Sequence, residues 1–204
     1  MFKQFASDAL GLSDIGKIIP ITEYHKTDSD DYVFYEDNEK IFFLIKSRKD
    51  EYCFTNRALI HLDGSSAISK KKALVRYEYY KYPISKVFLE TAGTIDLDIE
   101  IKFNMGEKIF SIDVDKQQIE LLRDLYKALY SISEAIMSAR KELDISEQTI
   151  KMAAEVVTVG IAENVNKADE LMKINNYIHS WTTQARKQYI QKDFSDIFLK
   201  YINN

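Results

Sequence analysis

The chain has 204 residues, of which 46% are hydrophobic and 29% are charged, and its formal net charge at pH 7 is -4. This composition is typical of a folded globular protein and excludes a disordered chain or one embedded in a membrane. Because the net charge is negative, the chain as a whole has no attraction for nucleic acid or for anionic membranes. We therefore expect no nucleic-acid partner.

The N-terminal residues 1–20 contain apolar side chains interrupted by Asp8, Asp14 and Lys17, so they lack the continuous apolar core of a signal peptide. No apolar run is long enough to cross a bilayer. The single cysteine, Cys53, lies in an alternating segment and is expected to be a small core residue in a reducing compartment. These observations predict a cytoplasmic protein whose first residues form a helical segment.

Residues from about 30 to 115 predict a β-rich region, in which short β-favouring runs alternate with turn signals. Eight strands are expected, near residues 32–35, 39–47, 51–54, 57–62, 73–81, 84–91, 95–103 and 108–114. Pro83 falls between two of these runs, where its missing N–H costs the sheet least. After residue 115 the pattern is helical to the end of the chain.

The last two strands form the clearest hairpin. A tight turn in segment 104–107, with Gly106 in a positive-φ conformation, would place Asn104 opposite Glu107. The register that follows puts Asp98 opposite Asp113, on the face away from the apolar side chains. The carboxylates expected on this face are Asp96, Asp98, Glu100, Asp113 and Asp115.

Three interpretations of this carboxylate cluster stay open. Like charges directly across a ladder repel, so the side chains could simply spread into water. A second interpretation pairs the cluster with basic side chains of a neighbouring copy, such as Arg57 or Lys86. The third, a bound cation, lacks the residue spacing of a calcium loop, and we expect no metal site. The candidate subunit-interface residues on this face are Asp96, Asp98, Glu100 and Asp113.

The helical region begins with an amphipathic helix from about residue 119, which is expected to cover an open end or face of the sheet. The polar segment 141–148 is expected to be a linker, with Ser146 capping a helix that runs to about residue 162. A second arm begins at Asn166 and completes a helical hairpin.

The second arm carries a seam of apolar residues at alternating spacings of three and four. The seam consists of Leu171, Ile174, Ile178, Trp181 and Ala185, continued by Ile190, Phe194, Ile197 and Tyr201. A hairpin can bury such a seam within itself. The arm nevertheless has more aromatic surface than one short partner helix covers, which indicates contact with another chain. The candidate interface residues here are Leu171, Ile174, Ile178 and Trp181.

The serine-rich segment 63–73 ends in a cluster of lysines, and an arginine follows. Lys70, Lys71, Lys72 and Arg76 are therefore candidates for contact with an anion or a lipid headgroup. The alternative interpretation is that lysines near a hairpin tip only keep a sheet edge soluble.

No arrangement of residues in the sequence indicates catalysis. The histidines His25, His61 and His179 are scattered and do not have the spacing of metal ligands. His61 is expected on the exposed phase of its strand, with no serine or cysteine nucleophile marked as its partner. We expect no enzyme activity and no cofactor.

Three segments, residues 54–63, 82–93 and 96–103, resemble recurring features of the bacterial pleckstrin-homology-like domains, and the likeness covers about residues 20 to 130. The C-terminal hairpin is similar to the YvbH-like oligomerisation region attached to that domain in some bacterial proteins. The resemblance implies an α+β fold, a PH-like antiparallel β-barrel capped by a helix and followed by a C-terminal α-helical hairpin. It also implies two domains, residues 1–138 and 139–204.

The resemblance further implies assembly of the chain with copies of itself into a closed ring or dome, without catalysis. The expected function is therefore that of a non-enzymatic, self-assembling protein for scaffolding or for binding an unknown protein partner. The alternative is a peripheral adaptor that binds anionic lipid at a membrane surface through the lysine-rich loop and gains avidity from several copies.

Overall fold

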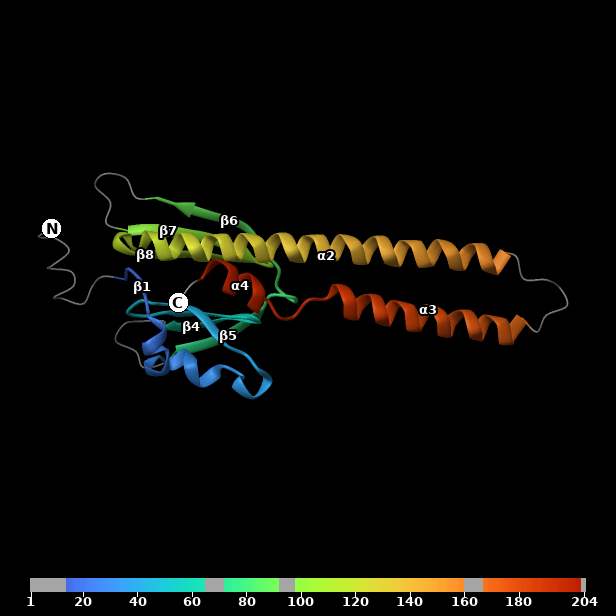
Figure 1. Ribbon diagram of the computed structural model, residues 1–204, viewed down its shortest axis with the longest axis horizontal. Coiled ribbons are helices and arrows are strands. Elements are labelled where there is room, and N and C mark those ends of the chain that lie inside the picture. The colour runs from blue at the N-terminus through green and yellow to red at the C-terminus, as the bar shows by residue number, and fades with distance from the viewer. Residues whose placement is uncertain (1–13, 65–71, 92–97, 160–166, 203–204) are drawn as a thin grey trace, which may run out of the picture. The chain divides into compact units, whose positions relative to one another are not determined.

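A computed structural model describes residues 14–64, 72–91, 98–159 and 167–202. The chain forms two compact units (Figure 1). Unit 1 comprises Met1–Ser133 and Lys192–Asn204, and unit 2 comprises Glu134–Gln191. The last residues of the chain thus belong to unit 1, whereas the sequence placed them in the hairpin domain.

Unit 1 contains two antiparallel sheets. The five-stranded sheet has the order β1 (Lys17–Ile18), β2 (Ile41–Lys46), β3 (Glu51–Thr55), β4 (Ala58–Gly64) and β5 (Lys72–Glu78). The three-stranded sheet has the order β6 (Ile84–Glu90), β7 (Asp98–Met105) and β8 (Lys108–Asp115). Seven of the eight predicted strands therefore exist, β2 to β8. Within the described residues the sheets do not close into a barrel by continuous pairing, and a bridge between Gly16 and Val114 links their edges.

The strand predicted at residues 32–35 is wrong. The chain there forms a series of 3-10 helices, Ile21–Lys26, Asp28–Tyr32 and Tyr35–Asp37. The run of β-favouring side chains is too short for a strand, and acidic residues that favour turns flank it. Within this run Val33 is buried and Phe34 is exposed. Asn38 ends the series in a left-handed conformation with φ of 60°.

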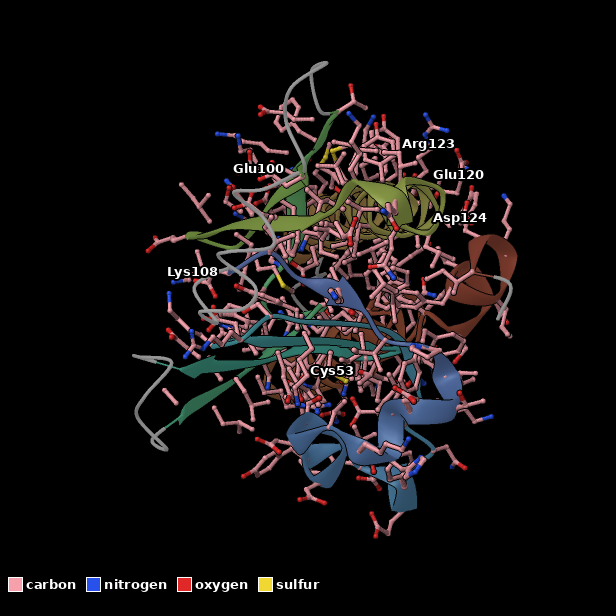
Figure 2. The ribbon with its side chains drawn as sticks, turned by 90° about the vertical axis from the view of Figure 1, so that its left-hand side faces the viewer. Cys53, Glu100, Lys108, Glu120, Arg123 and Asp124 are labelled. Atoms are coloured by element: carbon pink, nitrogen blue, oxygen red, sulfur yellow. The ribbon has the colours of Figure 1, made fainter. Side chains whose placement is uncertain are left out.

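The central strands of the five-stranded sheet, β2 to β4, are buried on both faces. The run Ile41–Ile45 of β2 is buried at every position, as expected for a continuous apolar strand rather than an alternating one. One face is covered by the 3-10 segment, and its core cluster consists of Tyr24, Val33, Ile41, Leu44, Cys53, Ile60 and Leu62. Figure 2 shows Cys53 between the sheet and that segment. The prediction that Cys53 is a core residue is confirmed.

The other face of the five-stranded sheet meets the three-stranded sheet through aromatic side chains. Phe54 of β3 lies 6.0 Å from Phe103 of β7, and Phe103 stacks on Phe110 of β8 at 5.1 Å, measured between ring centroids. Contacts of this kind stabilise a core beyond the area they bury. Aromatic side chains therefore join the two sheets in the interior of unit 1.

The hairpin of β7 and β8 has a register different from the predicted one. The turn consists of Gly106 and Glu107, so Met105 pairs with Lys108 and Glu100 pairs with Asp113. Gly106 has φ of 60°, as predicted, and it stands at the first central position, where type II' turns require glycine. Since the partner of each residue moves by two positions, the apolar and polar faces remain as expected.

The long helix α2 (Ile119–Val159) is continuous, so the linker predicted at 141–148 and the cap at Ser146 are wrong. This stretch contains neither glycine nor proline, and its lysine, glutamate and leucine residues favour helix. The first turns of α2 bury Leu122, Leu125, Leu129 and Ile132 in unit 1. The expected helix over the sheet is therefore present, and the same helix continues into unit 2 from Glu134.

Unit 2 pairs the second part of α2 with α3 (Lys167–Tyr189), which carries Asp169 and Glu170 in its first turn, as predicted. The expected cap at Asn166 lies outside the described residues. After Tyr189 the helix ends, and the chain returns to unit 1 as the short helix α4 (Ser195–Tyr201). Phe194, which the sequence assigned to the seam, is fully buried in unit 1 instead.

Helix α4 completes the core of unit 1. Phe198 stacks on Phe42 of β2 with ring centroids 5.1 Å apart, and Phe194 meets Tyr79 edge to face at 5.7 Å. The backbone N–H of Phe194 donates to the carbonyl oxygen of Asn56 at 2.9 Å. The first unit is thus assembled from both ends of the chain, with unit 2 inserted between them.

Candidate functional site

The predicted carboxylate cluster is on the outer face of the three-stranded sheet. Glu100 stands opposite Asp113, and Asp98 stands opposite Asp115. Glu100 also faces Glu90 of β6, which the sequence analysis did not include. Figure 2 shows Glu100 on this sheet. Asp96 lies outside the described residues.

A lysine within the cluster offsets the repulsion between these carboxylates. Lys102 follows Glu100 by two positions on the same face, and its Nζ lies 2.8 Å from Glu100 Oε2 and 3.0 Å from Glu90 Oε2. Ser111 donates a further hydrogen bond to Glu100. The sequence analysis missed Lys102, although the alternation of the strand places it on this face.

The remaining acids of the face have different environments. Burial, with the nearby charges of Glu100 and Asp98, raises the pKa of the Asp113 carboxyl. Asp115 accepts a hydrogen bond from the backbone N–H of Gln117 at 2.9 Å and so caps the 3-10 turn that precedes α2. Among the described residues, no group of three histidine, cysteine or acidic side chains has a metal-binding arrangement.

Arg76, predicted as an anion or lipid contact, takes part in an internal network. Its Nη2 lies 2.8 Å from Oε1 of Glu39, whose side chain is fully buried, and its guanidinium lies 4.6 Å above the ring of Phe34. Glu39 also accepts hydrogen bonds from the Thr55 hydroxyl at 2.5 Å and from the Phe34 N–H at 2.9 Å. This arginine therefore holds the 3-10 segment to the sheet.

The rest of the lysine-rich loop is not described by the structure. Lys70 and Lys71 lie outside the described residues, and Lys72 begins β5 without a described side chain. Of the four residues predicted to contact a lipid, Arg76 is therefore the one whose side chain the structure describes, and it is paired with Glu39.

The helical hairpin of unit 2 contains an open apolar groove. The groove has a volume of about 270 Å³ and is lined by Ile150, Ala153, Ala154, Lys173, Ile174, Tyr177 and Ile178. Two predicted seam residues, Ile174 and Ile178, thus line it. Tyr177 at its edge is 64% exposed.

Unit 2 buries few of its apolar side chains. Trp181 is half-buried, Leu171 is 49% exposed, and only Ile136 and Ala185 are buried among the described residues of this unit. Two helices contact each other along one face only, and in a stable helical bundle further helices ordinarily cover the rest of the apolar surface. A single chain therefore covers only in part the section of the predicted seam that lies in α3.

His61 is another residue whose environment differs from the prediction. It is 7% exposed, not on the surface, because both faces of its sheet are covered. Its ring stacks on Tyr52 at 4.5 Å and meets Phe110 of the opposite sheet at 5.6 Å. Burial lowers the pKa of His61, although its Nε2 lies 3.7 Å from the Asp50 carboxylate.

This pKa predicts a loss of stability in mild acid. Below about pH 6.5 the unfolded chain binds a proton at His61 that the folded chain does not, so the free energy of unfolding falls as the pH decreases. In urea titrations at pH 7.5 and 5.5, His61→Gln should lose less stability than the unchanged protein, by up to about 1.4 kcal/mol. His25→Gln is the control, because His25 is exposed. Equal pH dependence in all three proteins would contradict the assignment.

None of the helices in the described part of the chain combines the length and the apolarity needed to cross a membrane.

Comparison with known proteins supports both parts of the architecture. The family described as "Bacterial PH domain" matches residues 9–133, and the "YvbH-like oligomerisation region" matches residues 144–204. The chain is 54% identical over its whole length to the whole of a Bacillus subtilis (strain 168) protein called "Uncharacterized protein YvbH". It is also similar to the crystal structure of a PH domain containing protein from Exiguobacterium sibiricum 255-15, with a TM-score of 0.84 and 45% identity. That match covers 93% of this chain and 100% of the other. The predicted PH-like fold is confirmed.

Proposed function

The chain belongs to the bacterial PH domain family, and on this basis we propose that it is a non-enzymatic protein that assembles with copies of itself through the helical hairpin of unit 2. The PH-like unit then serves as the surface presented by the assembly, for scaffolding or for binding a protein partner. A closed ring is the arrangement we favour, because a head-to-tail contact either closes into a ring or continues without limit.

The observation that carries this proposal is the incomplete burial of the hairpin. The groove between α2 and α3 is lined almost entirely by apolar side chains, and Tyr177 stands exposed beside it. A contiguous apolar surface of this kind marks an interaction site in a soluble protein. The match of residues 144–204 to an oligomerisation region supports a second copy as the group that covers it.

The carboxylate face of the three-stranded sheet has a secondary place in the proposal. Lys102 already offsets Glu100 and Glu90, which supports a solvated face more than an interface. Contact between this face and basic side chains of a neighbouring copy remains the weaker part of the proposal. We do not extend it to anionic lipid, because Arg76 is paired with Glu39.

Excision of the hairpin tests the proposal while keeping unit 1 whole. Ser133 donates a hydrogen bond to the carbonyl oxygen of Ile84 at 2.7 Å, and Lys192 Nζ lies 5.1 Å from the ring centroid of Tyr80. Ile84 follows Tyr80 by four positions, which is at most about 14 Å of chain. A Gly/Ser linker of about eight residues has a comparable span and can replace residues 134–191.

The excised protein is expected to remain folded and to contain fewer copies in light scattering than the full chain does, because the copies that the hairpin joins separate. A cooperative thermal transition in the near-ultraviolet circular dichroism of the excised protein is the control for folding. If the excised protein kept the copy number of the full chain, the hairpin would not be the joining element. A full chain that scattered as a single copy would overturn self-association altogether.

A further inference from the structure

Strand β5 is an edge of the five-stranded sheet among the described residues. It pairs with β4 over its whole length and with no other described strand. Leu74 is 42% exposed and Val75, on the opposite face, is 39% exposed. A long edge strand with exposed apolar residues on both faces is a template for pairing with another strand.

The direction of the backbone groups of β5 follows from one hydrogen bond. Tyr79 N–H donates to the carbonyl oxygen of Arg57 at 3.1 Å, in register with the ladder, so Tyr79 points its backbone groups toward β4. These directions alternate along an antiparallel strand. Tyr77, Val75 and Ala73 therefore also face β4. Leu74 and Arg76 direct their N–H and C=O groups outward, and no hydrogen bond from these groups to a described residue is present.

The charges along β5 favour one register of an antiparallel pair between two copies of β5 over the neighbouring registers. With Val75 opposite Val75 of a second copy, Lys72 stands opposite Glu78, and Leu74 stands opposite Arg76. This register joins the outward groups of Leu74 and Arg76 in two symmetric hydrogen-bonded pairs. Because only every second residue of β5 points its backbone groups outward, the neighbouring registers differ by two residues. They place Arg76 opposite Lys72 or opposite the Arg76 of the second copy, and like charges across a ladder repel.

The side chains around this axis fit the same register. The guanidinium of Arg76 lies over the ring of Phe34. In the proposed register the Leu74 of the second copy stands opposite Arg76, where it would pack against the apolar methylene groups of the arginine side chain. The two Val75 side chains meet at a non-hydrogen-bonded position, where opposed residues lie closest and β-branched pairs stabilise a sheet.

We propose that β5 of one copy pairs antiparallel with β5 of a second copy across a two-fold axis at Val75, which joins the two five-stranded sheets into one. This contact is separate from the hairpin contact of the proposed function and does not depend on it. Because it is two-fold, it would join two ring assemblies in a pair if the hairpins form rings.

Cysteine cross-linking of the full chain tests this register. In Val75→Cys the two Cα atoms would lie about 4.5 Å apart, within the range of a disulfide. In the control Ala73→Cys, which places the thiol on the same face of β5, the distance is about 13 Å, four residues along the strand. Cys53 is buried, and burial raises the pKa of its thiol, so it does not compete.

Under mild oxidation we expect at least tenfold more disulfide-linked dimer from Val75→Cys than from Ala73→Cys on a non-reducing gel. Adding Leu74→Pro should abolish the link, because it removes an outward N–H and leaves the ladder with β4 intact. An unchanged melting temperature for Leu74→Pro is the control for folding. Equal cross-linking at both positions, or none at Val75→Cys, would overturn the proposal. The fall in copy number when residues 134–191 are excised tests the hairpin contact independently.

Discussion

Replacing Phe198 with alanine is expected to lower the free energy of unfolding of unit 1 by about 3–5 kcal/mol. Phe198 is fully buried, and its ring stacks on Phe42 of the five-stranded sheet at 5.1 Å. Removing it leaves a cavity between α4 and the sheet that the surrounding rings fill only in part. Urea unfolding followed by tyrosine near-ultraviolet circular dichroism measures the loss.

Leu199→Ala is the matched control for this prediction. Leu199 is the next residue of α4 but is 62% exposed, so its truncation should change the free energy of unfolding by less than about 0.5 kcal/mol. Equal effects at the two positions would mean that α4 does not pack into unit 1 as described. The prediction also implies that any truncation before Phe194 opens the core of the PH-like unit.

Replacing Glu39 with alanine is expected to destabilise unit 1 by about 3 kcal/mol, because a buried charge pair would lose one partner. Within the described part of the chain, Arg76 would keep one nearby carboxylate, that of Glu78, whose Oε1 lies 3.9 Å from Arg76 Nε. The Thr55 hydroxyl and the Phe34 N–H would lose their acceptor at the same time. Urea titration of the full chain measures the change.

A double-mutant cycle separates the ion pair from the other contacts of Glu39. If the pair carries the effect, Arg76→Ala should cost much less in the Glu39→Ala background than in the unchanged protein. Additive effects of the two substitutions would show that Glu39 and Arg76 do not interact. Glu36→Ala, at an exposed position of the same segment, should leave stability nearly unchanged.

Local patterns predicted most of the β-region. Seven strands follow from β-favouring runs between turn residues, and Gly106 marks the last turn because few other residues adopt its φ. The exact pairing did not follow, since Gly106 can occupy either central position of a tight turn and each choice moves the register. Lys102, which offsets the carboxylates, was visible in the strand's alternation and was overlooked.

Long-range packing explains the other failures. The prediction that His61 is exposed holds only for a sheet with one face in solvent. In this protein the 3-10 segment covers the second face of the sheet. Phe194 continues the helical spacing of the seam, but periodicity does not indicate which partner covers a side chain. The break after Tyr189 lacks glycine and proline. It is stabilised instead by Asp193, which accepts hydrogen bonds from Ser195 and from Asn56 of unit 1.

Unit 2, the helical hairpin, is inserted in the chain between the two parts of unit 1. The length of this hairpin can therefore change without a change in the PH-like unit. Residues could be added to α2 beyond Ser133 and in equal number to α3 without altering any side chain that fills the PH-like core. Each added residue extends a helix by about 1.5 Å. In the proposed assembly through the hairpin, a change of arm length would therefore change the distance between the PH-like units and leave their cores unchanged.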